Sequence, residues 1–259
     1  MFFVSQGQVI EVACPASHSW DKTSNLSTST SAAGYTRASY FGGPRVLRTM
    51  KLSVGVMTPE EQAKIDALTH LGFGSQLGFI PCGAERSNLM PPGASLLATV
   101  AGVVPRATTV ASDGTVYPGG VNTPTTALVA SAVPFAYPGQ VVSLSIVGRA
   151  GAAMSIQWLD ATGASLGFVG AVADSAGYTR VRRGTTAPAT AVAFNVHVKG
   201  DLAAPALTLG STLYPWQVGQ VAKSVVIESA GVEVIAAWDT SRAPLQTHTY
   251  TIKEVGDYV

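Results

Sequence analysis

The chain has 259 residues, of which 12% are charged, and its formal net charge at neutral pH is +1. This balance gives no reason to expect a nucleic-acid partner, and glycine, proline, serine or threonine interrupts every apolar run before it reaches the roughly 18 residues of a membrane span. The length suffices for one large or two ordinary domains, each able to bury a core. So little charge favours a surface that partners cover in an assembly.

Residues 1–87 are predicted to form a strand-rich unit that carries one helix. The stretch YTRASYFGGPRVLRTMKLSVGVM indicates two strands around its Gly-Gly-Pro turn. In TPEEQAKIDALTHLGFG, Thr58 and Glu61 have the spacing of a capping box, and Pro59 fits the first helical position. Apolar residues then recur at three-residue spacing, so one side of the helix should lie on a sheet. Gly72 ends the helix, and QLGFIPCGAE adds one more strand.

Residues 88–222 are predicted to form an antiparallel β-sandwich, in the form of a jelly roll. Three segments, PGQVVSLSIVG, AMSIQWLD and AVAFNVHVKG, alternate between apolar and polar residues. Period-two alternation is typical of a sheet with one buried face. The turn DATGAS has the composition of a hairpin loop. The residues expected to face inward are Val142, Leu144, Ile146, Met154, Ile156, Trp158, Val192, Phe194, Val196 and Val198.

Strand patterns return near the end of the chain in SVVIES, VEVIAAWD and THTYTIKEVG. These three strands have no domain of their own to join, whereas residues 1–87 hold too few strands to complete a sheet comfortably. The simplest arrangement is that residues 88–222 are inserted into a surface loop of the base domain. Surface loops tolerate an inserted domain well when the two ends of that domain lie close together. We therefore expect a mostly β fold in which 1–87 and 223–259 form a split base domain with one short helix, and 88–222 form the inserted sandwich.

No residues are singled out for catalysis, for a cofactor or for a metal, so we do not expect an enzyme. Gly163–Gly167 spells G-x-S-x-G, but the nucleophile elbow needs a strand before it and a helix after it, and here the motif falls in a hairpin. The histidines are scattered and the acidic residues dispersed. Cys14 and Cys82 lack metal-ligand spacing and are expected to be reduced thiols.

The outward face of the sandwich is the one surface predicted to suit a small ligand. Short polar side chains on a sheet could donate and accept hydrogen bonds with a sugar, and an aromatic platform usually accompanies them. Because Trp158 is expected to point inward, aromatic residues near strand ends are the substitutes. The alternative is a face covered by solvent or by partners. The face comprises Ser143, Ser145, Ser155, Gln157, Asn195 and His197, and the candidate glycan contacts are Gln157, Asn195, His197, Tyr178 and Trp216.

The base segments resemble the minor tail proteins of tailed bacteriophages that infect actinobacteria. The resemblance lies in GYTRASYFGGPRVLRTMKLSV, in TPEEQAKIDALTHLGFGSQLGFIPCGAERSNLMPP and in the close from PWQVGQVAKSVVIES to YTIKEVG. The inserted part looks like a galactose-binding carbohydrate-binding module, although the acidic cluster of the calcium site common in such modules is absent. In its role the base is similar to distal tail proteins, which form rings at the end of the tail tube.

This resemblance implies a structural protein of the phage tail tip, assembled in the bacterial host cytoplasm and located in the virion. Its implied partners are the tail tube, the tail hub, the fibres and further copies of itself in a trimer or a hexameric ring. Closed symmetry would repeat a weak contact, so avidity replaces one strong site. The alternative is a glycan-binding adhesin that recognises the host cell wall. Neither reading includes a cofactor, nucleic acid or membrane insertion.

Overall fold

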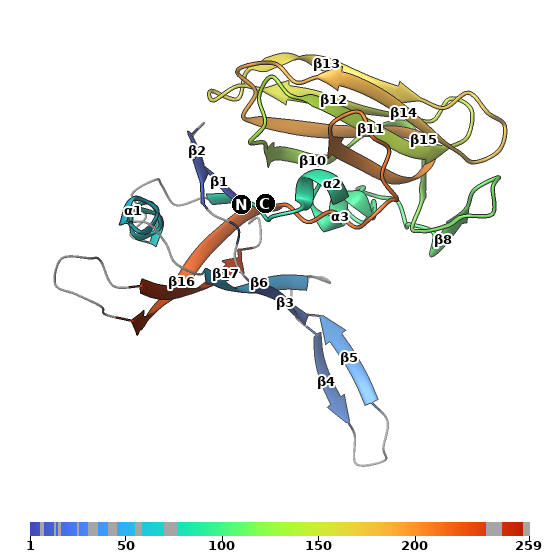
Figure 1. Cartoon of the computed structure of the whole chain (residues 1–259). Coiled ribbons are helices and arrows are strands. Elements are labelled where there is room, and N and C mark those ends of the chain that lie inside the picture. The colour runs from blue at the N-terminus through green and yellow to red at the C-terminus, as the bar shows by residue number, and fades with distance from the viewer. Residues whose placement is uncertain are drawn as a thin grey trace. The chain divides into compact units, whose positions relative to one another are not determined.

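The computed structural model is rich in β-strands that pair antiparallel with their neighbours, which confirms the predicted mostly β fold class (Figure 1). Helices are few and short. The structure describes residues 1–5, 8–12, 14, 17–24, 26–30, 36–40, 46–54, 59–69, 77–236 and 245–255.

The chain divides into two compact units, each built from separate segments. The sandwich unit comprises Met1–Glu11 and Leu77–Lys223, and the base unit comprises Val12–Gln76 and Ser224–Val259. These divisions do not coincide with the predicted domain boundaries, which remain a prediction. The first eleven residues group with the middle of the chain, and the sandwich unit resumes at Leu77 and not at Asn88.

The base unit contains antiparallel strands from both ends of its sequence. β3 (Ser17–Ser24) pairs with β6 (Val46–Val54), β6 pairs with β17 (Leu245–Glu254), and β17 pairs with β16 (Ala222–Ala236). The C-terminal strands are therefore joined by backbone hydrogen bonds to a strand of the opening part of the chain. A separate two-stranded sheet is formed by β4 (Leu26–Thr30) and β5 (Thr36–Tyr40).

An ion pair reinforces this connection within the base unit. The Nε and Nη2 atoms of Arg48 donate to the two carboxylate oxygens of Glu254 at 3.0 and 3.1 Å. Arg48 is buried, and a two-pronged guanidinium–carboxylate contact of this kind is stronger than a single exposed pair. The contact ties β6 to the end of β17.

The predicted helix is present as α1 (Pro59–Thr69) and begins at the expected proline. Ile65 and Leu68 are each 1% exposed, as their three-residue spacing predicts. The Thr69 hydroxyl donates to the Ile65 carbonyl at 2.8 Å in the last turn. The predicted cap Thr58 and stop Gly72 lie outside the described residues.

Stability of the base unit should fall steeply at alkaline pH because of Tyr250. Burial, with a smaller contribution from the Asp66 carboxylate, raises the pKa of Tyr250 to about 12. The pKa of an unfolded tyrosine is about 10. The unfolded chain therefore loses its proton first, so the stabilising contribution is full below about pH 10 and is lost as the pH rises towards about 12.

We expect Tyr250→Phe to flatten this loss of stability. Urea midpoints measured at half-unit steps from pH 9 to pH 12 would fall less for the variant than for the parent chain. An equal fall of the urea midpoint with pH in the two proteins would contradict the assignment of the alkaline loss of stability to Tyr250.

The sandwich unit begins with a short antiparallel group of strands. β1 (Phe2–Ser5) pairs with β2 (Gln8–Glu11) on one edge and with β7 (Leu77–Ile80) on the other. Two single-turn helices, α2 (Ala84–Ser87) and α3 (Pro92–Ser95), follow β7. Val4, Ile80 and Ala84 belong to the same buried core as the strands of the sandwich.

The sandwich itself is one six-stranded sheet. Its strands are β10 (Val121–Pro134), β11 (Val141–Gly148), β12 (Ala153–Leu159), β13 (Ser165–Val172), β14 (Thr179–Thr186) and β15 (Ala193–Leu209). The first half of the long strand β15 pairs with β10 on one edge and with β12 on the other, and its second half pairs with β11. This gives one layer in the order β13-β12-β15-β10 and another in the order β15-β11-β14.

Aromatic rings fill the core of the sandwich. The ring centroid of Phe135 lies 5.0 Å from that of Trp158 and 6.1 Å from that of Phe194. Trp158 is 3% exposed, so the alternation of β12 predicts its inward orientation correctly. Offset and edge-to-face rings at these spacings add stabilisation beyond burial alone, so the layer that carries β12 rests on a well-packed core.

The polar residues of β11 are not on an open face, contrary to the prediction. Ser143 and Ser145 are each 2% exposed. The Ser143 hydroxyl donates to the Gly210 carbonyl at 2.8 Å, and Arg180 on β14 donates both to Ser145 Oγ and to the Tyr214 carbonyl. Residues 211–221, the covering segment, run over this layer without regular secondary structure. Alternation identifies the two sides of a strand, but it does not show what lies over them.

Both cysteines are disulfide-bonded, which corrects the expectation of reduced thiols at Cys14 and Cys82. Sequence spacing alone carried no information on their pairing.

Candidate functional site

The outward face of the β13-β12-β15-β10 layer gathers three of the predicted glycan contacts. In the register of the sheet, Gln157 lies opposite Asn195 on one side and opposite Phe168 on the other. In the neighbouring row, Ser155 lies opposite His197. Because alternate residues of a strand share a face, Gln157, Asn195 and His197 are presented together.

A hydrogen-bonded amide pair lies at the centre of this face. Asn195 Nδ2 donates to Gln157 Oε1 at 2.9 Å, and Asn195 Oδ1 accepts the backbone N–H of Ala132 at 2.8 Å. These bonds fix which way both amides point. Within the described residues the side-chain nitrogen of Gln157 has no hydrogen-bond partner, so its N–H groups are available to a ligand.

His197 is the second polar feature of the face. Its Nε2 atom is buried and has no hydrogen-bond partner among the described residues. The Phe168 ring centroid lies 6.1 Å from that of His197, and Leu128 on β10 lies opposite His197. A buried polar atom without a partner costs about 1–3 kcal/mol, a cost that native structures usually avoid. His197 is therefore a position where a ligand hydroxyl would gain a hydrogen bond.

Sequence reasoning missed the aromatic residue of this face. Phe168 is 65% exposed, and it stands next to Gln157 on β13. The available signal was the hairpin that joins β12 to β13, because its register places Phe168 beside Gln157. Apolar residues occupy both sides of β13, which hides the phase of its alternation.

The two predicted aromatic contacts, Tyr178 and Trp216, belong to a different cluster. Both pack against a buried cluster that is formed by Ala111, Tyr117, Val147, Ala203 and Ala204. Trp216 Nε1 donates to the Pro205 carbonyl at 3.2 Å, and its ring lies 6.4 Å from that of Tyr117 in β9 (Val116–Pro118). The structure therefore does not group these rings with the amide pair.

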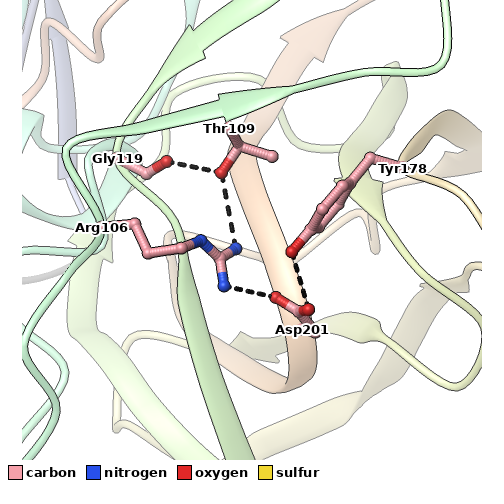
Figure 2. Close-up of polar contacts among 5 residues, drawn as sticks. All are labelled: Arg106, Thr109, Gly119, Tyr178 and Asp201. Carbon is pink, nitrogen blue, oxygen red and sulfur yellow. Dashed lines mark hydrogen bonds and ion pairs between the residues drawn. The ribbon is translucent and has the colours of Figure 1, made fainter.

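Tyr178 takes part in a polar clamp that holds the loop before β8 (Thr108–Val110), as Figure 2 shows. Arg106 Nη1 donates to Asp201 Oδ1 at 2.6 Å, and the Tyr178 hydroxyl donates to Asp201 Oδ2 at 2.7 Å. Thr109 accepts a longer bond from Arg106 and donates to the Gly119 carbonyl at 2.8 Å. Both oxygens of Asp201 are thus occupied by protein donors.

The electrostatics of the clamp favour a neutral Tyr178. Burial and the hydrogen bond to Asp201 raise the pKa of Tyr178. The guanidinium carbons of Arg149 and Arg106 lie 4.5 and 5.4 Å from the centroid of its ring, within the range of a cation–π contact. With its donors and acceptors paired internally, the clamp is best explained as structural.

Breaking the clamp should loosen the β8–β9 hairpin. We expect Asp201→Ala to cost about 1–2 kcal/mol, because the pair is only partly buried and the variant leaves Arg106 and Tyr178 without their acceptor. Limited trypsin digestion would show faster cleavage after Arg106. Asp174→Ala, which changes an exposed carboxylate, is the matched control. Unchanged cleavage in Asp201→Ala would contradict the role of the clamp.

Within the described residues, the other motifs of the sequence do not form a second site. Ser165 of the G-x-S-x-G motif begins β13 directly after the hairpin turn, so the motif has the predicted strand–turn–strand context. Among the residues that the structure describes, no group of three or more His, Cys, Asp or Glu side chains is placed to hold a metal ion. No helix in the described ranges has both the length and the apolar character to cross a membrane.

Comparisons with known proteins give little further information. No protein-family model and no curated protein matches the chain. Among solved structures, the chain is similar to the enzymatically active domain of tailspike protein 4 of bacteriophage CBA120. The TM-score is 0.32 and the sequence identity 14%, over 48% of this chain and 21% of that chain. Nothing about activity is transferred from a likeness at this level, and the absence of enzymatic activity in this chain stays a prediction.

Proposed function

We propose that this chain is a structural protein of the tail tip of a long-tailed bacteriophage, and that its sandwich unit presents a saccharide-binding face outward. The tail assignment is supported by the resemblance of the base segments to minor tail proteins. The saccharide-binding role is supported by one observation above all: an exposed Phe168 stands beside the hydrogen-bonded Gln157–Asn195 amide pair.

In this proposal the base unit makes the permanent contacts of the assembly. Its partners are the tail tube, the tail hub, the fibres and further copies of the chain in a trimer or a hexameric ring. With only 12% charged residues, the chain suits large permanent interfaces, which are depleted in charge. The protein is assembled in the host cytoplasm and carried in the virion.

Two measurements test the structural role. The mass of the purified chain, by sedimentation equilibrium, should correspond to a closed oligomer, and antibodies raised against it should label the tail tip of virions in electron micrographs. A monomer over the whole concentration range, together with unlabelled virions, would contradict the proposal.

The second candidate function, a glycan-binding adhesin for the host cell wall, is favoured by the outward face itself. Pull-down of the intact chain with purified actinobacterial cell walls tests it directly. We expect the chain to be retained and then released by soluble cell-wall oligosaccharides. A chain that stays in the supernatant would count against the adhesin and would leave the structural role standing.

A further inference from the structure

We propose that the face around Phe168 binds an uncharged saccharide, with one side of a pyranose ring stacked on the phenyl ring and its hydroxyls bonded to Gln157 and His197. This inference rests on the proposed saccharide-binding role and specifies its ligand class and its contact residues.

The first argument is the exposure of Phe168. Phe168 is 65% exposed although it stands on a strand whose opposite side faces the core. An isolated exposed apolar residue needs no explanation, but here the ring is the neighbour of an oriented polar pair. An apolar surface with a few placed polar groups is the general composition of small-ligand sites. The C–H groups on one side of a pyranose ring match such a flat apolar surface.

The second argument is the supply of hydrogen bonds beside that ring. The bond from Asn195 holds the Gln157 oxygen, so the Gln157 nitrogen faces away from Asn195 with its donors unused within the described residues. His197 Nε2 also lacks a partner there. A sugar hydroxyl both donates and accepts, so it can complement an amide N–H and either tautomer of an imidazole. Phe168 and Leu128 flank His197 and are both exposed, so a ligand would reach the buried Nε2 atom after one of these two side chains moves.

The third argument is the absence of carboxylates among the outward positions defined by the register of these strands. Lys199 is the charged residue among them, and it lies in the row away from Phe168. The nearby Asp160 is engaged in its own turn, where one oxygen accepts from Thr162 and Ala164. A neutral ligand therefore complements the face better than a charged one. The outward positions are Leu128, Phe168, Gly170, Val172, Ala153, Ser155, Gln157, Asn195, His197 and Lys199.

The experiment uses the full chain on an array of uncharged hexose and N-acetylhexosamine oligosaccharides, with uronic-acid and sialic-acid oligosaccharides as the charged set. We expect binding to the uncharged set. Phe168→Ala should weaken it by about tenfold or more, the order expected for loss of an aromatic contact, while Phe168→Tyr retains it. Val172→Ala is the matched control, because Val172 is 64% exposed and shares the strand and the face of Phe168.

The outcomes separate a failure of the inference alone from a failure of the adhesin function on which it rests. If the parent chain binds and Phe168→Ala binds equally well, the inference fails while the adhesin function stands. Binding of the charged set alone, or an equal loss in Val172→Ala, would also overturn the inference. If the folded parent chain binds no oligosaccharide, both fail. Self-association of the parent chain that Phe168→Ala abolishes, without any binding of sugar, would assign the ring to a contact between copies instead.

Discussion

Replacing Asn88 with alanine should lower the free energy of unfolding of the sandwich unit by about 3 kcal/mol or more. Asn88 is fully buried, and its Oδ1 atom accepts the backbone N–H groups of Met90 and Leu207 at 3.2 and 3.1 Å. Its Nδ2 atom donates to the carbonyls of Pro205 and Gln217, each at 3.2 Å. Alanine supplies none of these bonds, and the buried backbone groups of several segments would lose their partner together.

Urea unfolding, followed by the fluorescence of Trp158 and Trp216 in this unit, measures the effect. Asn122→Ala is the control, because Asn122 is exposed on β10 and its change should stay within about 0.5 kcal/mol. A loss below about 1 kcal/mol in Asn88→Ala would show that Asn88 does not join these segments.

A side chain at Gly219 should be nearly as damaging, because the covering segment passes too close to the backbone before α3. A Cβ atom at this position would clash with the Met90 carbonyl oxygen and would lie 2.9 Å from that of Pro91. The backbone would have to move, and the bond from the Gly219 N–H to Ser95 Oγ at 2.8 Å would be strained or lost. We expect Gly219→Ala to cost about 3 kcal/mol, at the upper end for overpacking.

The control for this substitution is Gly184→Ala on β14. A Cβ atom there would meet only the Val142 carbonyl, at 4.0 Å, so the change should be close to neutral. Equal stabilities of the two variants, measured by thermal unfolding, would contradict the close approach at Gly219. Faster proteolysis within residues 211–221 of Gly219→Ala alone would support it.

Local sequence patterns predict the helices and strands of this protein better than they predict which segments pack over them. Pro59 predicts the start of α1, and strict alternation predicts that Trp158 and Phe194 lie in the core, because both features depend on near neighbours in the sequence. The alternation on β11 correctly assigns its residues to the two sides of the strand, but it wrongly predicts that the side with the serines is exposed. Ser143 bonds to Gly210, 67 positions later, and Ser145 bonds to Arg180, 35 positions later, which no local pattern reveals.

The candidate site shows the same limit. Gln157, Asn195 and His197 could be predicted because each lies on a well-patterned strand, and the register does bring them together. Tyr178 and Trp216 are predicted as contacts because they are aromatic residues near strand ends, but they pack against a separate buried cluster that includes Ala203 and Ala204 of β15. There Gly200 and Ala204 take positive φ angles of 83° and 51° between the two halves of the strand. The pairing of β15 with different neighbours depends on contacts far apart in the sequence.

The most direct test of the saccharide-binding face is a titration of the isotope-labelled chain with an uncharged oligosaccharide, monitored through its side-chain amide signals by NMR. We predict progressive shifts of the Gln157 and Asn195 amide signals, together with perturbation of the Phe168 ring, while the Asn88 amide signals stay unchanged. Shifts confined to residues around Tyr178 and Trp216, or none at millimolar sugar, would contradict the account.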